Sequence, residues 1–79
     1  MNERPKQRVY LPAILSDQYG MSPTRAEEDM LRGKVNLNGR DILARDPSEL
    51  WFFREDLDGK TIEVQGVENT YRFEYRAQE

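Results

Sequence analysis

Basic side chains gather in the first half of the chain. Residues 1–45 hold eight Lys and Arg against six Asp and Glu, whereas residues 46–79 hold four against nine, so the two halves carry +2 and −5. Guanidinium and ammonium groups bind phosphate, and side-chain amides add hydrogen bonds to a nucleic-acid backbone. We therefore predict RNA contacts at Arg4, Lys6, Arg8, Arg25, Arg32, Lys34, Asn36 and Arg40.

A simpler interpretation of the same residues is that they are solvated surface charges. The net charge of the whole chain is −3, which by itself argues against a protein that binds a polyanion. Asn38 and Gly39 are explained by turn geometry alone, because an Asn-Gly pair tolerates the positive φ angles of a tight hairpin.

A second candidate site is the aromatic run Trp51, Phe52 and Phe53 with the acidic pair Glu55 and Asp56 behind it. Exposed aromatic rings bind bases or protein partners. In a chain of 79 residues large side chains are also needed for the core, so we expect at least two of the three rings to be buried. The alternative function is thus a small acidic module that binds a partner protein through Trp51, Phe52, Glu55 and Asp56.

Several kinds of chemistry are excluded or disfavoured by composition. The chain has no Cys and no His, so it has no disulfide, thiolate, imidazole base or Cys/His zinc site. Gly59-Lys60-Thr61 ends like a phosphate-binding loop, but Arg54 stands where that loop needs glycine. No carboxylate pair has a catalytic partner beside it. We expect no enzyme activity, no cofactor and no metal.

The length of 79 residues fits one small domain. No apolar run of membrane-spanning length occurs, and residues 1–6 lack the apolar core of a signal peptide, so we expect a cytoplasmic protein without a membrane partner. Residues 1–8 offer no periodic apolar face. We predict that they form a flexible basic arm before a single domain at residues 9–76.

The first half contains the start and stop signals of two helices and a hairpin. Apolar spacing predicts a helix over residues 11–19, ended by Gly20. Ser22-Pro23 predicts the start of a second helix, with Thr24 as a competing start, and Gly33 is expected to end it in a left-handed conformation. A hairpin over residues 35–42 then turns at Asn38-Gly39.

The second half predicts further strands and one ambiguous segment. Asp46-Pro47 repeats the chemistry of a helix start, yet the run from Leu50 to Phe53 fits a short helix or a strand equally well. Alternation predicts strands around Ile62 and around Phe73, the second with an inward face of Tyr71, Phe73 and Tyr75. These elements define an α+β fold with a small, mostly antiparallel sheet.

The ordered parts of residues 9–65 resemble the S4 RNA-binding domain of ribosomal protein S4, pseudouridine synthases, some aminoacyl-tRNA synthetases and heat-shock protein 15. That resemblance implies an S4-like helix pair and β-hairpin (the alpha-L motif) packed on the sheet. It also implies binding to structured RNA such as rRNA or tRNA, or to a ribonucleoprotein. The matching residues are Gly20, Ser22, Ala26, Met30, Leu31, Gly33, Val35, Asn36, Leu37, Asn38 and Gly39, with 58–64 as the closing turn and strand.

Overall fold

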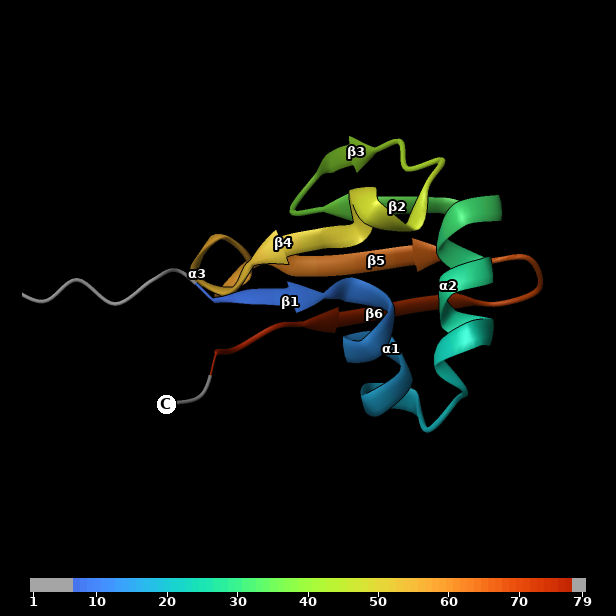
Figure 1. Cartoon of the computed structure of the whole chain (residues 1–79), viewed down its shortest axis with the longest axis horizontal. Helices are drawn as coiled ribbons and strands as arrows, with labels where there is room; N and C mark the ends of the chain where they lie inside the picture. The colour runs from blue at the N-terminus through green and yellow to red at the C-terminus, as the bar shows by residue number, and fades with distance from the viewer. Residues whose placement is uncertain (1–6, 78–79) are drawn as a thin grey trace, which may run out of the picture.

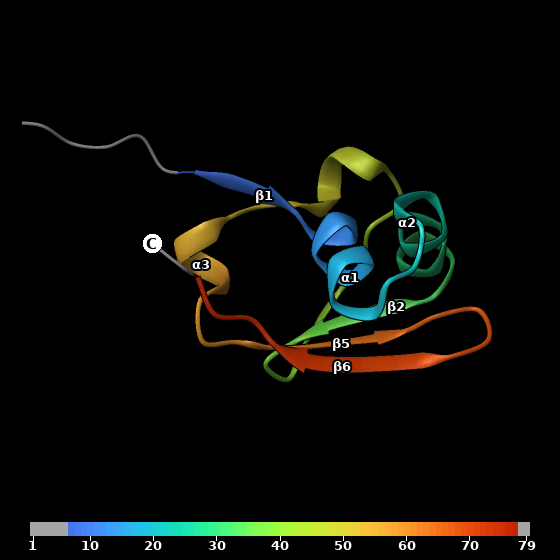
Figure 2. The same cartoon turned by 90° about the horizontal axis from the view of Figure 1, so that it is seen from below.

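A computed structural model describes residues 7–77 as a small α+β fold. Helices α1 and α2 cover one face of a four-stranded antiparallel sheet, and a separate two-stranded ribbon lies on the same side as the helices (Figure 1, Figure 2). The elements are β1 (Arg8–Tyr10), α1 (Leu11–Tyr19), α2 (Pro23–Arg32), β2 (Lys34–Leu37), β3 (Arg40–Ile42), the 3₁₀ turn η1 (Pro47–Leu50), β4 (Trp51–Phe53), α3 (Arg54–Leu57), β5 (Thr61–Gln65) and β6 (Thr70–Glu74).

The helix pair begins and ends at the residues that the local chemistry predicts. Helix α1 ends at Gly20, whose φ of 67° lies in the left-handed region that glycine tolerates best. Helix α2 begins after Ser22, whose hydroxyl accepts a hydrogen bond from the Arg25 amide at 3.1 Å. Thr24, the competing start, lies inside the helix.

Gly33 ends α2 for a reason other than the one predicted. Its φ is −99°, so the expected left-handed conformation is wrong. Glycine is needed there because β5 passes close by, and an added Cβ would lie 1.8 Å from the backbone oxygen of Gln65. The constraint is therefore tertiary and could not be seen in the local sequence.

The predicted hairpin is confirmed as β2 and β3 in the four-stranded sheet, whose order is β3-β2-β5-β6. Asn38 and Gly39 have φ angles of 53° and 93°, as a tight primed turn requires. Val35 lies opposite Ile42 on one side and opposite Val64 on the other, so these three side chains share the face below the helices.

The ambiguous segment is neither one helix nor one strand. It contains the single turn η1, the three-residue strand β4 and the single turn α3 in succession. Asp46 and Glu49 form a capping box at the start of η1, where Asp46-Pro47 predicted the start of a helix. Strand β4 pairs antiparallel with β1, so Arg8, predicted to be the last residue of a flexible arm, is instead the first residue of a strand. The rest of that predicted arm, apart from Gln7, lies outside the described residues.

The core lies between the helices and the sheet. Tyr71, Phe73 and Tyr75 are half-buried and pack against it, as predicted for the inward face of the last strand. The residues that form the core are Leu11, Leu15, Ala26, Met30, Val35, Leu37, Ala44, Leu50, Leu57, Ile62 and Val64.

Candidate functional site

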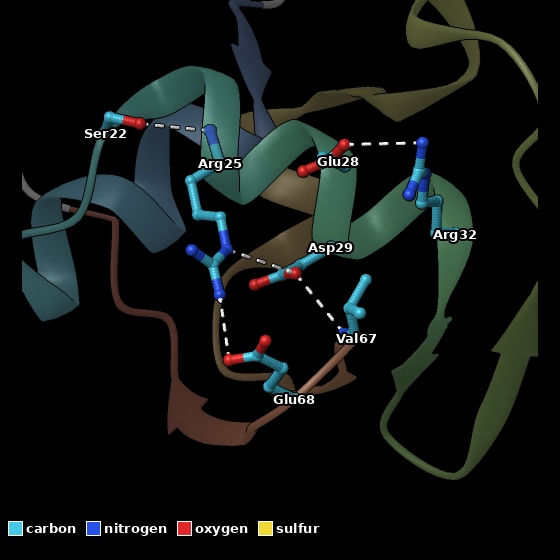
Figure 3. A network of polar contacts seen from close by, with 7 residues as sticks. All are labelled: Ser22, Arg25, Glu28, Asp29, Arg32, Val67 and Glu68. Carbon is cyan, nitrogen blue, oxygen red and sulfur yellow. Dashed lines mark hydrogen bonds and ion pairs between the residues drawn. The ribbon is translucent and has the colours of Figure 1, made fainter.

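The basic side chains of α2 are each close to a carboxylate (Figure 3). Arg25 lies 3.7 Å from Asp29 and 3.6 Å from Glu68, a residue of the turn between β5 and β6. Arg32 lies 3.6 Å from Glu28, one helical turn away. The acids of this helix thus neutralise the two bases that we predicted to contact phosphate.

The hairpin places two more predicted residues around one carboxylate. The Lys34 Nζ lies 3.9 Å from Asp41 Oδ2, and the Asn36 amide donates a hydrogen bond of 2.9 Å to Asp41 Oδ1. The Asn36 side-chain oxygen accepts the Gly39 amide at 2.8 Å. The nitrogen and the oxygen of the Asn36 side-chain amide therefore both support the turn.

Arg40 lies on the other face of the sheet from Lys34 and Asn36. The register pairs Arg40 with Leu37, whose side chain is buried, whereas Asn36 is paired with Asp41. Cross-strand partners share a face, so Lys34 and Arg40, both predicted to contact RNA, do not lie on one face of the sheet. The two-residue turn at Asn38-Gly39 sets this register, because it places residues 37 and 40 opposite each other.

The remaining predicted bases do not complete a basic surface in the described part of the chain. Arg4 and Lys6 lie outside the described residues. The Arg8 guanidinium lies over the Phe53 ring, 5.4 Å from its centroid. Of the predicted set within residues 7–77, Arg25, Arg32 and Lys34 are paired with acids, and no ion pair involves Arg40.

A second surface is built by the outer face of the β1–β4 ribbon, which we call the aromatic ribbon. Its four residues are Arg8 and Tyr10 from β1 and Trp51 and Phe53 from β4. The register places Tyr10 opposite Trp51 and Arg8 opposite Phe53. The Tyr10 and Trp51 ring centroids lie 4.8 Å apart with an interplanar angle of 32°. Trp51 is nevertheless 49% exposed, so a large ring is fixed in place at the surface.

Strand alternation explains why the expected burial of the aromatic run is wrong. Successive side chains of a strand point to opposite faces, so Phe52 packs against the core with Val9, while Trp51 and Phe53 lie on the other face. Phe52 and Phe53 are half-buried and none of the three rings is fully buried. The predicted partner site is divided accordingly, because Phe52 faces away from Trp51.

Tyr10 is held by a hydrogen bond from its hydroxyl to the Glu27 carboxylate of α2. Burial and this acidic neighbour raise the pKa of Tyr10 to about 12, because both disfavour the phenolate. The phenol stays protonated at neutral pH and keeps donating to Glu27. The ring beneath Trp51 is thereby fixed by a second element of the fold.

Acidic side chains lie at both ends of β4. Asp46 caps η1 and Glu49 lies in it, just before the strand, and Glu55 and Asp56 follow the strand in α3; all four are exposed. Hydrogen bonds from Ser48 lower the pKa of Asp46, so this carboxylate is ionised at neutral pH. Glu55 and Asp56 were predicted from the sequence to belong to this surface, but Tyr10 was not. The signal for Tyr10 is the pairing of β1 with β4, which brings together two residues that are 41 positions apart in the sequence.

An open groove of about 860 Å³ adjoins the ribbon between α1 and the end of β6. Its lining combines apolar side chains with charges of both signs, including Val9, Ile14, Asp17, Arg54, Tyr75 and Arg76. Within residues 7–77, no three acidic side chains come together in a way that could hold a metal ion.

Comparisons with known proteins give this chain no relative. No protein-family model matches it, and neither a curated protein nor a solved structure resembles it significantly. Among the helices of residues 7–77, none has the length and apolarity needed to cross a lipid bilayer.

Proposed function

We propose that this domain is a non-enzymatic module that binds a partner protein through the aromatic ribbon. The observation that carries this proposal is the half-exposed indole of Trp51, stacked on Tyr10 at the surface. Trp, Tyr and Arg dominate the binding energy of protein interfaces, and the ribbon presents all three in adjacent positions.

Preorganisation supports the same proposal. The Tyr10–Glu27 hydrogen bond fixes one ring, and the packing of Val9 and Phe52 on the core fixes the strands that carry the others. A surface whose side chains are already ordered loses less conformational entropy on binding. By contrast, Arg25, Arg32 and Lys34 are paired with carboxylates, which lowers their net attraction for phosphate.

A pull-down with matched variants tests the proposal. Trp51→Ala removes the exposed indole, whereas Leu43→Ala removes an apolar side chain that is 79% exposed at another place. We expect a protein partner to be retained after nuclease treatment and by Leu43→Ala, and to be lost with Trp51→Ala. Equal retention by both variants, each shown to be folded by circular dichroism, would refute the ribbon as the contact surface.

Structured RNA is the second candidate ligand, and the order of elements favours it. Helices α1 and α2 are followed directly by the β2–β3 hairpin, an order that supports an S4-like helix pair and hairpin. The ion pairs of Arg32 and Lys34 are exposed, and such pairs are worth about 0–1 kcal/mol, so phosphate could replace the carboxylates at little cost.

A mobility-shift titration at low salt separates the RNA proposal from the protein proposal. RNA binding at tens of micromolar protein should be weakened by Lys34→Glu and Arg25→Glu. Arg76→Glu is the charge-matched control, because Arg76 is also an exposed base paired with one acid, Glu74, and lies beyond the predicted surface. Absence of any shift with rRNA or tRNA fragments would exclude the RNA candidate.

A further inference from the structure

The aromatic ribbon already binds one cation of its own chain. The Arg8 guanidinium lies over Phe53 at 5.4 Å from the ring centroid, within the distance of a cation–π interaction. Both residues belong to the outer face that also carries Tyr10 and Trp51. The ribbon is thus a surface on which a guanidinium is stable.

The neighbouring ring on the same face is the indole of Trp51. Indole is the strongest cation–π acceptor among the side chains. Tyr10 lies against the Trp51 ring, yet Trp51 keeps 49% of its surface open. Within the described part of the chain, no Lys or Arg lies over Trp51.

The charge around Trp51 is suited to a cationic partner. Residues 45–58, the segment that contains β4, carry five carboxylates against two bases, Arg45 and Arg54, and Arg8 adds a third base on the ribbon itself. Glu27 adds a further carboxylate beneath Tyr10. An excess of acids next to an aromatic surface attracts positive segments and repels phosphate. The five carboxylates are those of Asp46, Glu49, Glu55, Asp56 and Asp58.

We infer that the partner of this surface is a basic peptide segment that places an Arg or Lys side chain over the open part of Trp51, with its other bases near the acids of η1 and α3. The inference rests on the proposed function and specifies its ligand. The apolar stem of the cationic side chain packs on the indole, and the charged head faces the carboxylates.

Trp51 is the only tryptophan in the chain, so its emission reports on this surface directly. The probe is a blocked peptide of about ten residues that alternates arginine with leucine, compared with the same peptide carrying citrulline in place of arginine. We expect a saturable change in Trp51 emission with the arginine peptide, and binding at least about tenfold weaker with the citrulline peptide or at high salt.

Variants locate the site with a labelled form of the same peptide, read by fluorescence anisotropy. Trp51→Leu should abolish binding, Trp51→Phe should weaken it, and the double variant Glu55→Gln with Asp56→Asn should weaken it by about threefold to tenfold. Leu43→Ala should bind like the parent chain.

Equal binding of the arginine and citrulline peptides, or no binding at about millimolar peptide, would overturn the inference. The proposed function would survive that result if capture of a protein partner still depended on Trp51. The proposed function would be refuted separately if Trp51→Ala captured the protein partner as well as the parent chain does, regardless of the peptide results.

Discussion

The carboxylate of Asp29 accepts a hydrogen bond from the backbone amide of Val67 at 3.3 Å, across 38 positions of the sequence (Figure 3). Asp29 is 1% exposed, and the same carboxylate oxygen, Oδ1, lies 3.7 Å from the Arg25 guanidinium. Next to Val67, a Cβ on Gly66 would lie 2.8 Å from the Asp29 Cγ. Helix α2 and the turn between β5 and β6 are therefore joined at one buried acid.

Removing this acid should destabilise the fold. Asp29→Ala deprives the Val67 amide of its acceptor and Arg25 of a partner, and we expect a loss of about 1–3 kcal/mol in the free energy of unfolding. Asp29→Asn keeps an acceptor oxygen and should lose less. Urea denaturation measures both, and Glu28→Ala, which removes an exposed pair with Arg32, should change stability by no more than about 0.5 kcal/mol. A loss as large in Glu28→Ala would contradict a special role for the buried acid.

Gly33 and Gly39 provide a matched comparison of two reasons for glycine. Gly33→Ala places a Cβ 1.8 Å from the Gln65 oxygen, so we expect a loss above about 3 kcal/mol as α2 moves away from β5. Gly39→Ala meets no atom within 4 Å but keeps a positive φ, and should lose about 1 kcal/mol. Thermal unfolding, followed by circular dichroism, ranks the two losses of stability. A smaller loss for Gly33→Ala than for Gly39→Ala would show that β5 can move aside at little cost.

Tyr10 should make stability depend on alkaline pH. Folding raises the pKa of Tyr10 from its ordinary value of 10.0 to about 12, so the folded state holds the phenol proton more tightly. This contribution is complete below pH 10 and is lost as the pH rises towards 12. In Tyr10→Phe, the free energy of unfolding should no longer fall over that alkaline range. At neutral pH the same variant should lose about 1–3 kcal/mol in the free energy of unfolding, because its hydrogen bond to Glu27 is missing.

Tyr71→Phe is the control for this measurement, because no side-chain hydrogen bond of Tyr71 is found within residues 7–77. Denaturant midpoints measured at intervals from neutral pH to the alkaline limit give both profiles. The explanation fails if Tyr10→Phe retains the full alkaline decline of the parent chain.

Tyr19 protects the outer edge of the four-stranded sheet. Its hydroxyl donates to the Arg72 carbonyl at 2.8 Å and accepts the Arg72 amide at 3.2 Å, which occupies backbone groups of the edge strand β6. Tyr19→Phe should speed hydrogen exchange of the Arg72 amide by about fivefold or more, equivalent to about 1 kcal/mol. Tyr75→Phe should leave that amide unchanged. Unaltered exchange in Tyr19→Phe would show that the edge is protected by other means.

The elements whose signals are local were predicted from the sequence. Gly20 and the apolar spacing define α1, and Ser22 with Pro23 starts α2. Asn38-Gly39 defines the hairpin turn, and Asp46 with Glu49 starts η1. Each of these signals acts within about four residues, through a cap, a turn or a fixed backbone angle, so no distant residue is needed to interpret it.

The tertiary structure decided the features that join distant residues. It paired Tyr10 with Trp51 and brought β5 against Gly33. A side chain's face and charge partners depend on strand register and on which segments pack together, and these are fixed by the summed burial of the whole core. The sequence by itself therefore determined where the helices and turns begin and end, while only the folded chain decided which side chains form a surface.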